Sequence, residues 1–146
     1  MKISTKGRYA IRLMIDIAEH SSNGNVSIKE VANRQNISLK YLEQIVNMLS
    51  KAGFLRSQRG LQGGYKLARS PKDYTVGDIL RITEGKMAPV SCLEDEVNQC
   101  PRVSTCSTIR FWSGLYKVIN DYLDSTTIAD LVMEDERKRE NFDYYI

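Results

Sequence analysis

Residues 27–53 read SIKEVANRQNISLKYLEQIVNMLSKAG and predict two helices separated by a tight turn. Ser27 and the glutamate three residues later have the spacing of a capping box, so a short helix is expected to begin there. Asn36 tolerates the left-handed conformation that ends such a helix. Ser38 then caps a second helix, which runs to about Gly53. A short helix, a turn of about three residues and a longer amphipathic helix make a helix-turn-helix.

The second of these helices has two faces of different chemistry. Its apolar side chains fall on one side and are expected to be buried: Leu42, Ile45, Val46 and Leu49. The opposite side carries Lys40, Gln44, Asn47 and Lys51, with Tyr41 and Glu43 on the two flanks. Lysine binds phosphate and amide side chains hydrogen-bond base edges, so this face suits duplex DNA. An ordinary solvated helix face is the alternative.

The segment FLRSQRGLQGGYKLA, residues 54–68, predicts a β-hairpin. Its glycine-rich turn allows close approach to another backbone, and Arg59 at the base of the tip is suited to a narrow DNA groove. A helix-turn-helix followed by a basic hairpin is a winged helix. We therefore expect residues 1–85 to form a mainly α-helical, winged helix-turn-helix DNA-binding domain with a small β-hairpin as its wing.

Further helices are expected on both sides of this motif. Ser4 or Thr5 caps a first helix that ends near residues 21–25, and residues 75–85 form a short capped helix. A long helix is expected over residues 107–124, which at 1.5 Å per residue is about 27 Å long.

This long helix carries a wide apolar stripe. Its members recur at three- and four-residue steps: Ile109, Trp112, Tyr116, Ile119 and Leu123, with Leu115 and Tyr122 beside them. Two-fold DNA sites are usually read by two-fold proteins, so we expect residues 107–146 to be a dimerisation helix and a C-terminal tail, and the chain to form a homodimer. Packing of the helix onto the wing domain is the alternative. Thr127 and Asp130 cap a last short helix, after which the tail ends in FDYYI.

Charge is distributed unevenly along the chain. Residues 1–72 carry 13 Lys and Arg against four acids, a net charge of +9, whereas residues 73–146 carry 8 against 14, a net charge of −6. A basic half of this size favours a polyanion partner, and together with the helix-turn-helix and the basic hairpin it favours a double-stranded DNA operator. Chance clustering of solvated charges is the alternative.

Other classes of protein fit the sequence less well. No apolar run approaches the length that spans a bilayer, and the first residues lack a secretory core, so we expect a cytoplasmic protein without a membrane partner. No nucleophile–base pair, phosphate loop or paired catalytic carboxylates are apparent, so an enzyme is not expected. A pure protein-interaction module would explain the long helix and the tail but not the basic front half.

All three cysteines lie in one aperiodic stretch, residues 86–106. Seven residues separate Cys92 from Cys100, and five separate Cys100 from Cys106. This spacing is unlike that of zinc ribbons. Three thiolates on one flexible loop can instead bind one iron–sulphur cluster, a group for which cysteine is the preferred ligand. Thiol chemistry at one reactive cysteine, or three incidental thiols, are the alternatives.

Three segments together resemble the Rrf2 family of bacterial winged-helix regulators: MKISTKGRYA at residues 1–10, ISLKYLEQ at 37–44 and RGLQGGY at 59–65. The resemblance is closest to the family's iron–sulphur cluster regulators, and it implies a [2Fe-2S] cluster held by Cys92, Cys100 and Cys106. It also implies that Lys40, Tyr41, Glu43, Gln44 and Arg59 face DNA. With these, the predicted DNA-binding residues are Ser38, Lys40, Tyr41, Glu43, Gln44, Asn47, Lys51, Arg59 and Gln62. The expected function is that of a DNA-binding transcriptional regulator that acts as a repressor. It would sense iron–sulphur status and control the genes of iron–sulphur cluster biogenesis.

The chain departs from that branch at two points. The first cysteine gap is seven residues where the best-known cluster binders have five, and Ile109 stands where they carry a histidine. The sequence does not identify the fourth ligand of the cluster, for which the candidates are Glu43, Glu94, Asp95, Glu96 and other groups. Two other branches compete. A nitric-oxide-sensing or thiol redox branch has similar cysteine gaps, but its members carry an aspartate near position 8, where this chain has Arg8. A cysteine-metabolism branch resembles the N-terminus, residues 123–127 and the tail, and its members dock that tail into cysteine synthase.

Overall fold

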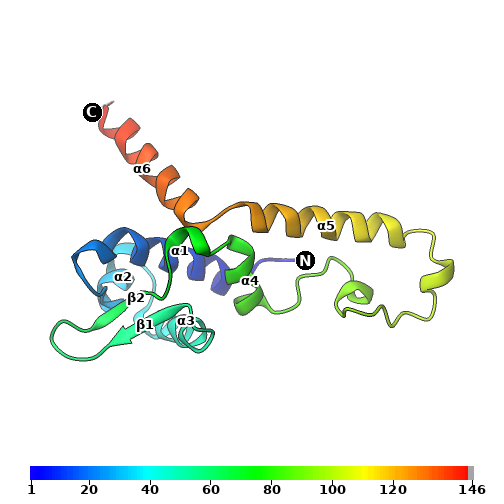
Figure 1. The fold of residues 1–146 in the computed structure, drawn as a ribbon, viewed down its shortest axis with the longest axis horizontal. Coiled ribbons are helices and arrows are strands. Elements are labelled where there is room, and N and C mark those ends of the chain that lie inside the picture. Colours follow the sequence, from blue (N-terminus) through cyan, green and yellow to red (C-terminus); the bar gives the residue numbers. More distant parts are fainter. Residues whose placement is uncertain (145–146) are drawn as a thin grey trace.

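The computed structural model describes residues 1–144, and it shows a helical body from which two helices project (Figure 1). In chain order the helices and strands are α1 (Thr5–His20), α2 (Ile28–Gln35), α3 (Leu39–Lys51), β1 (Leu55–Gln58), β2 (Gly64–Leu67), α4 (Val76–Glu84), α5 (Ile109–Ser125) and α6 (Ile128–Tyr144). Short 3-10 turns lie at η1 (Ser21–Asn23), η2 (Pro71–Asp73), η3 (Ser91–Leu93) and η4 (Val103–Thr105). The expected fold class, mainly α with one β-hairpin, is confirmed.

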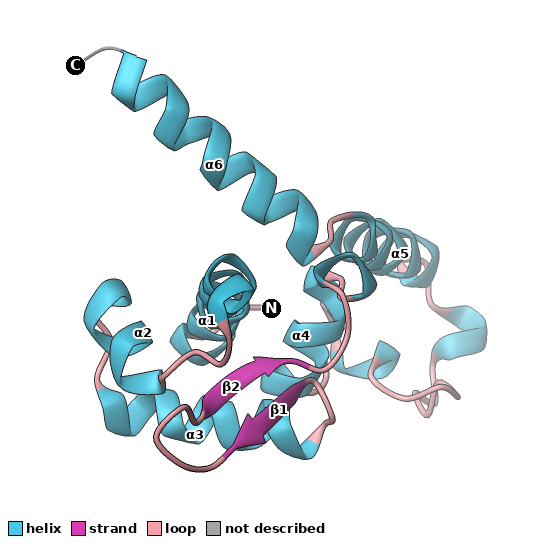
Figure 2. Cartoon of the chain, turned by 60° about the vertical axis from the view of Figure 1, so that its left-hand side comes forward, coloured by secondary structure: helices cyan, strands magenta, loops and turns pink. Residues whose placement is uncertain are grey.

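Helix α1 lies at the centre of the body and packs against α2, α3, α4 and α6 (Figure 2). It begins as expected, because the Ser4 hydroxyl accepts a hydrogen bond from the Gly7 amide at 3.3 Å. Its inward face is fully buried through Ala10, Leu13, Met14 and Ile17, and α3 adds Leu42, Ile45, Val46 and Leu49. Burial of each large apolar side chain contributes about 1.5–3 kcal/mol. The body therefore has a hydrophobic core supplied by one chain.

The helix-turn-helix forms where the sequence predicts it, with one difference at its start. Asn36 ends α2 in the left-handed region at φ +53°, and the Ser38 hydroxyl accepts from the Tyr41 amide at 3.2 Å. The capping box expected at Ser27 is wrong, because the Ser27 side chain makes no cap hydrogen bond. The start of α2 is fixed by Val26 instead, which exchanges two backbone hydrogen bonds of 2.8 Å with Tyr65 in the hairpin.

The hairpin is a two-stranded antiparallel sheet in which Leu55 pairs with Leu67 and Gln58 pairs with Gly64. Gly64 adopts φ +144°, and a Cβ atom there would lie 2.5 Å from the Val26 carbonyl oxygen. A glycine is therefore required for the hairpin to approach the connection between α1 and α2. This contact fixes the wing on the body.

Helix α6 is longer than the sequence indicates. The prediction of a short last helix followed by a tail is wrong, because residues 128–144 form one helix of 17 residues. Thr127 and Asp130 cap it reciprocally, as expected, with hydrogen bonds of 2.9 and 3.1 Å. Ion pairs one turn apart, such as Asp135 with Arg139, support helix through the charged stretch. The last two residues of the predicted FDYYI tail, 145–146, lie outside the described residues.

Helix α5 extends away from the body, and the cysteine-bearing segment runs from α4 to its far end (Figure 1). None of its residues, all of which the structure describes, is buried. The predicted stripe through Trp112, Tyr116, Ile119 and Leu123 is half-buried. The most exposed large side chains form the neighbouring row instead: Phe111 (64% exposed), Leu115 (37%), Val118 (65%) and Tyr122 (74%). We call this row the apolar row of α5.

Candidate nucleic-acid interface and cysteine loop

Five polar side chains are exposed on the outer face and one flank of α3, as the helical pattern predicts: Lys40, Glu43, Gln44, Asn47 and Lys51. Among residues 1–144, none of the five has a side-chain hydrogen bond or an ion pair with another residue. Their donors and acceptors are therefore satisfied by solvent in the free protein. Such a face is available to phosphates and base edges.

The wing lies beside this face of α3. A groove of about 240 Å³ between them is lined by Glu43, Asn47, Ser57 and Tyr65, among others. Arg59 and Gln62 are exposed in the turn between β1 and β2. Figure 2 shows α3 and the hairpin on the same side of the body. Helix and wing thus lie side by side along one groove.

Two of the predicted DNA-binding residues have structural partners for their side chains. The Ser38 hydroxyl caps α3. The half-buried Tyr41 ring packs edge-on against Tyr9 of α1, with 5.8 Å between ring centroids. Ser38 thus fixes the start of α3, and Tyr41 orients α3 against α1.

Asn25 also belongs to the surface of α3 and the wing, although the sequence pattern does not indicate it. Its side-chain amide donates to Gln58 Oε1 at 2.7 Å and to the Gln62 carbonyl oxygen at 3.2 Å. These two bonds hold the wing against the turn between α1 and α2. In the sequence Asn25 is one of several turn residues in SSNGN, and its partners are more than 30 residues away, so no local pattern identifies it.

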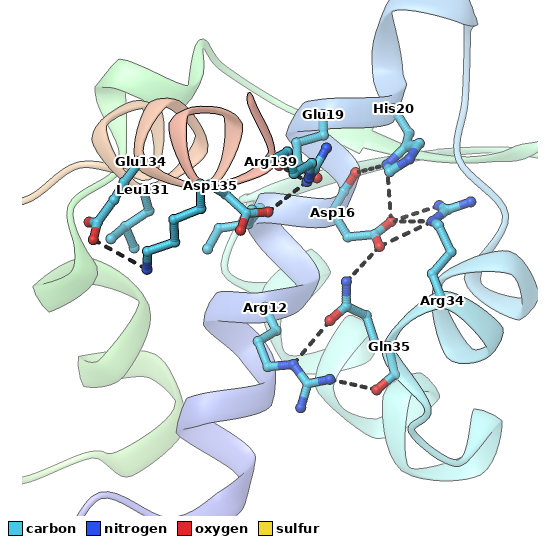
Figure 3. A pocket seen from close by; sticks show the side chains of 12 residues that line it. Arg12, Asp16, Glu19, His20, Arg34, Gln35, Leu131, Glu134, Asp135 and Arg139 are labelled. Carbon is cyan, nitrogen blue, oxygen red and sulfur yellow. Dashed lines mark hydrogen bonds and ion pairs between the residues drawn. The ribbon is translucent and has the colours of Figure 1, made fainter. Parts of the chain in front are cut away.

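A pocket of about 640 Å³ lies between α1, α2 and α6 (Figure 3). Asp16, which is 1% exposed, accepts hydrogen bonds of 2.7–3.2 Å from Arg34 and one of 2.8 Å from Gln35. The bond to Asp16 raises the pKa of Arg34. Arg139 of α6 pairs with Glu19 at 2.7 Å. These interactions fix both α2 and α6 on α1, so the pocket helps to orient the helix-turn-helix.

The cysteine loop, residues 86–106, does not bring its three thiols together. Cys92, Cys100 and Cys106 are each half-buried free thiols. The Cys106 sulphur lies 3.5 Å from the Thr108 hydroxyl, and this hydrogen bond lowers the pKa of the Cys106 thiol. Within the described part of the chain, no three His, Cys, Asp or Glu side chains are placed to hold a metal ion. The donor types suit an iron–sulphur cluster, but this arrangement of the loop does not fit one.

Of the four carboxylates considered as fourth ligands, two pair with one lysine. Lys86 pairs with Asp95 at 2.8 Å and with Glu94 at 3.9 Å, and the bond with Asp95 raises the pKa of Lys86. Glu96 is exposed. Glu43 lies on α3, and Figures 1 and 2 show that helix and the cysteine loop in separate parts of the molecule.

The fold and the exposed reading face are those of a winged helix-turn-helix protein. A family profile for Rrf2, described as an iron-dependent transcriptional regulator, matches residues 3–134. The chain belongs to the Rrf2 family of transcriptional regulators, as the three sequence segments indicated.

Individual relatives include members of two branches. The chain is 44% identical over 135 residues to the protein Rrf2 of Nitratidesulfovibrio vulgaris, a match that covers 92% of this chain and 89% of that protein. It is 40% identical over 146 residues to CymR of Bacillus subtilis, and both chains are covered completely. The CymR structure, described as that of the global cysteine regulator of B. subtilis, superimposes with a TM-score of 0.75. The structure of T. potens IscR superimposes with a TM-score of 0.76 at 40% identity, covering 94% of this chain and 90% of that chain.

No helix within residues 1–144 has both the length and the apolar content that a membrane-spanning helix needs.

Proposed function

We propose that this Rrf2-family regulator binds operator DNA as a homodimer, with α3 in the major groove and the wing against the neighbouring minor groove. The observation that carries the proposal is the set of five unpartnered polar side chains on α3 beside the exposed wing. The net charge of +9 over residues 1–72 supports it, because phosphate contacts dominate affinity for DNA. Gln44 lies at the centre of the face and is the proposed base-reading residue, and Lys51 at the end of α3 contacts phosphate.

Substitutions at these two positions test the proposal. Gln44→Ala should lower the discrimination between an operator and a random duplex by about 1–3 kcal/mol, the effect of losing a base-edge contact. Lys51→Ala should weaken binding to both duplexes equally and flatten the salt dependence. Lys117→Ala, which removes an exposed lysine on α5, is the control and should change neither. Equal loss on both duplexes for Gln44→Ala would contradict the assignment of the reading residue.

We propose that dimers form along α5, so that residues 1–85 read DNA, residues 86–106 sense a signal and residues 107–146 hold the two chains together. The apolar row of α5 supports this division, because its side chains are exposed in the single chain. A second copy of the same helix would cover them by an isologous contact.

We propose that the signal is iron–sulphur status, sensed through Cys92, Cys100 and Cys106. The clustering of all three cysteines in one loop supports this. A bound cluster would be a labile group whose presence reports iron–sulphur status. The loop must rearrange before its three thiols can bind a cluster. Anaerobic purification should give a coloured protein that contains iron and sulphide, and a triple Cys→Ala variant should be a colourless dimer. Operator affinity of the two proteins, in the same salt and without oxygen, should differ; equal affinity on every operator would contradict the sensor role.

A second candidate is a repressor of cysteine metabolism that acts together with cysteine synthase. The match to CymR over the full length of both chains favours it. Under this hypothesis purified protein is colourless and binds cysteine synthase, and removal of residues 142–146 abolishes that binding. A protein that contains iron and does not bind cysteine synthase would exclude this candidate. A protein with neither property, but with operator binding that changes on thiol oxidation, would favour a nitric-oxide or thiol redox sensor.

A further inference from the structure

Helix α5 packs against α4 of the body and joins α6 at its C-terminal end. The connection to α6 is pinned by backbone hydrogen bonds of 2.9 Å, from Val76 to the Thr126 carbonyl and from Ile128 to the Tyr74 carbonyl. These bonds fix the connection but leave the direction of α5 open. Since no residue of α5 is buried, its direction is set by contacts with α4, the body helix against which it packs.

Arg81 of α4 makes most of the polar part of that contact, and the Thr75 hydroxyl at the start of α4 adds one longer hydrogen bond of 3.5 Å to Asp124. Arg81 donates to the two carboxylate oxygens of Asp124 at 2.7 and 2.9 Å, and to Asn120 Oδ1 at 3.0 Å. Asn120 and Asp124 are one turn apart on α5. A planar guanidinium that binds both acceptors restricts the tilt of α5 as well as its rotation. We call Arg81, Asn120 and Asp124 the α4–α5 clamp.

The surroundings of the clamp are shaped to hold it. A Cβ atom at Gly77, in the first turn of α4, would collide with the Asp124 carboxylate. The carboxylate therefore rests directly on the helix backbone. The bond with Arg81 lowers the pKa of Asp124 and raises that of Arg81, so both groups are charged at neutral pH.

The α4–α5 clamp fixes the direction of α5 more than it stabilises the fold. The side chains of Arg81 and Asp124 are 39% and 46% exposed, and an ion pair so open to solvent contributes little to stability. The 17 residues of α5 make a lever about 25 Å long. A change of about 10° at its base moves the far end by about 4 Å, close to the rise of one base pair, about 3.4 Å. Since α4 also packs against α3, the clamp connects the reading helix to the dimer helix.

We propose that Arg81 is a positioning residue that, through Asp124 and Asn120, sets the angle between the reading head and α5 and thereby the half-site spacing that the dimer accepts. This inference rests on the proposed function, in which α3 reads DNA and α5 joins two chains. It goes beyond that function because it assigns spacing specificity to residues that touch neither DNA nor the second chain.

The test compares Arg81→Ala with a matched control, Lys117→Ala. Lys117 also pairs with an aspartate on α5, Asp121, but that pair lies within one helix. Duplexes are first selected from a randomised library by the wild-type protein, and base pairs are then inserted or removed between their half-sites. Each change displaces one half-site by about 3.4 Å and turns it by about a tenth of a helical turn. Wild type and Lys117→Ala should lose at least tenfold in affinity per inserted base pair, and Arg81→Ala less than threefold.

A second measurement does not depend on DNA. Spin labels are placed at Leu61→Cys, in the exposed wing tip, after the three native cysteines are replaced by serine. The distance distribution between the two wings of the dimer should broaden in Arg81→Ala and stay narrow in Lys117→Ala. Thermal unfolding and sedimentation should be unchanged in both variants.

The outcomes separate the two proposals. An unchanged spacing preference together with an unchanged distance distribution in Arg81→Ala would overturn the inference alone. A wild-type chain that selects no duplex, or that sediments as a monomer, would overturn the proposed function and this inference with it.

Discussion

The winged-helix body differs from residues 86–125, which we call the arm. Both contain helices with a similar apolar pattern, but the pattern is buried in the body and exposed in the arm. In α1 the residues at helical spacing are fully buried among α2, α3 and α4. In α5 the same kind of pattern leaves Phe111, Val118 and Tyr122 mostly exposed. An amphipathic pattern thus identifies the side chains that need to be covered. It does not identify the chain that covers them.

The same contrast exists between two ion pairs of identical chemistry. Arg34 with Asp16 in the body and Arg81 with Asp124 at the base of the arm each have a closest N–O distance of 2.7 Å. The Asp16 side chain is 1% exposed, whereas that of Asp124 is 46% exposed. The buried carboxylate depends on its partner for solvation, and the exposed one retains water. The first pair therefore stabilises the fold, and the second orients a helix.

The largest expected effect is on the arm. Replacing Leu115 and Val118 by aspartate should convert the dimer to a monomer, because each apolar side chain buried between two copies contributes about 1.5–3 kcal/mol. The dissociation constant should rise more than a hundredfold in analytical ultracentrifugation. The body should keep its helical circular dichroism, since neither residue belongs to its core. A dimer that persists would place the interface elsewhere.

A smaller effect is expected from removing one carboxylate of each ion pair. Asp16→Ala should lower the free energy of unfolding by about 2–3 kcal/mol, because it leaves the partly buried Arg34 and Gln35 without their acceptor. Asp124→Ala should lower it by less than about 1 kcal/mol. Urea denaturation of the two variants measures the difference. Equal losses would mean that burial does not distinguish the two pairs.

The smallest expected effect concerns the titration of Asp124. Arg81 holds the pKa of this carboxyl below its ordinary value of 3.8, so the clamp is intact at neutral pH and opens only as the pH falls through that lowered value. Carbon NMR of the Asp124 carboxyl should give a midpoint below 3.8 in the wild type. In Arg81→Ala the midpoint should return toward 3.8. The same midpoint in both proteins would show that the clamp does not form in solution.

The elements predicted well are those with strong local signals. Ser4, Asn36 and Ser38 bound their helices as expected because caps and left-handed turns depend on a few neighbouring residues. The prediction failed at Ser27, where the hairpin fixes the helix start instead, and in α6, where a polar composition looked like a tail although its charges pair one turn apart. The exposed polar side of α3 followed from its helical period. The wing contact of Asn25 did not, because its partners come from a distant segment.

By itself the sequence determined the winged helix-turn-helix, the polar face of α3 and the membership of the Rrf2 family, since periodicity, caps and motifs are local properties of the chain. Only the tertiary structure decided which row of α5 stays exposed, how Asn25 holds the wing, and that Arg81 binds Asn120 and Asp124 across 39 and 43 residues. It also decided that the three cysteines lie apart in the folded loop. Such contacts depend on the relative placement of whole helices, and that placement results from the packing of all their side chains together.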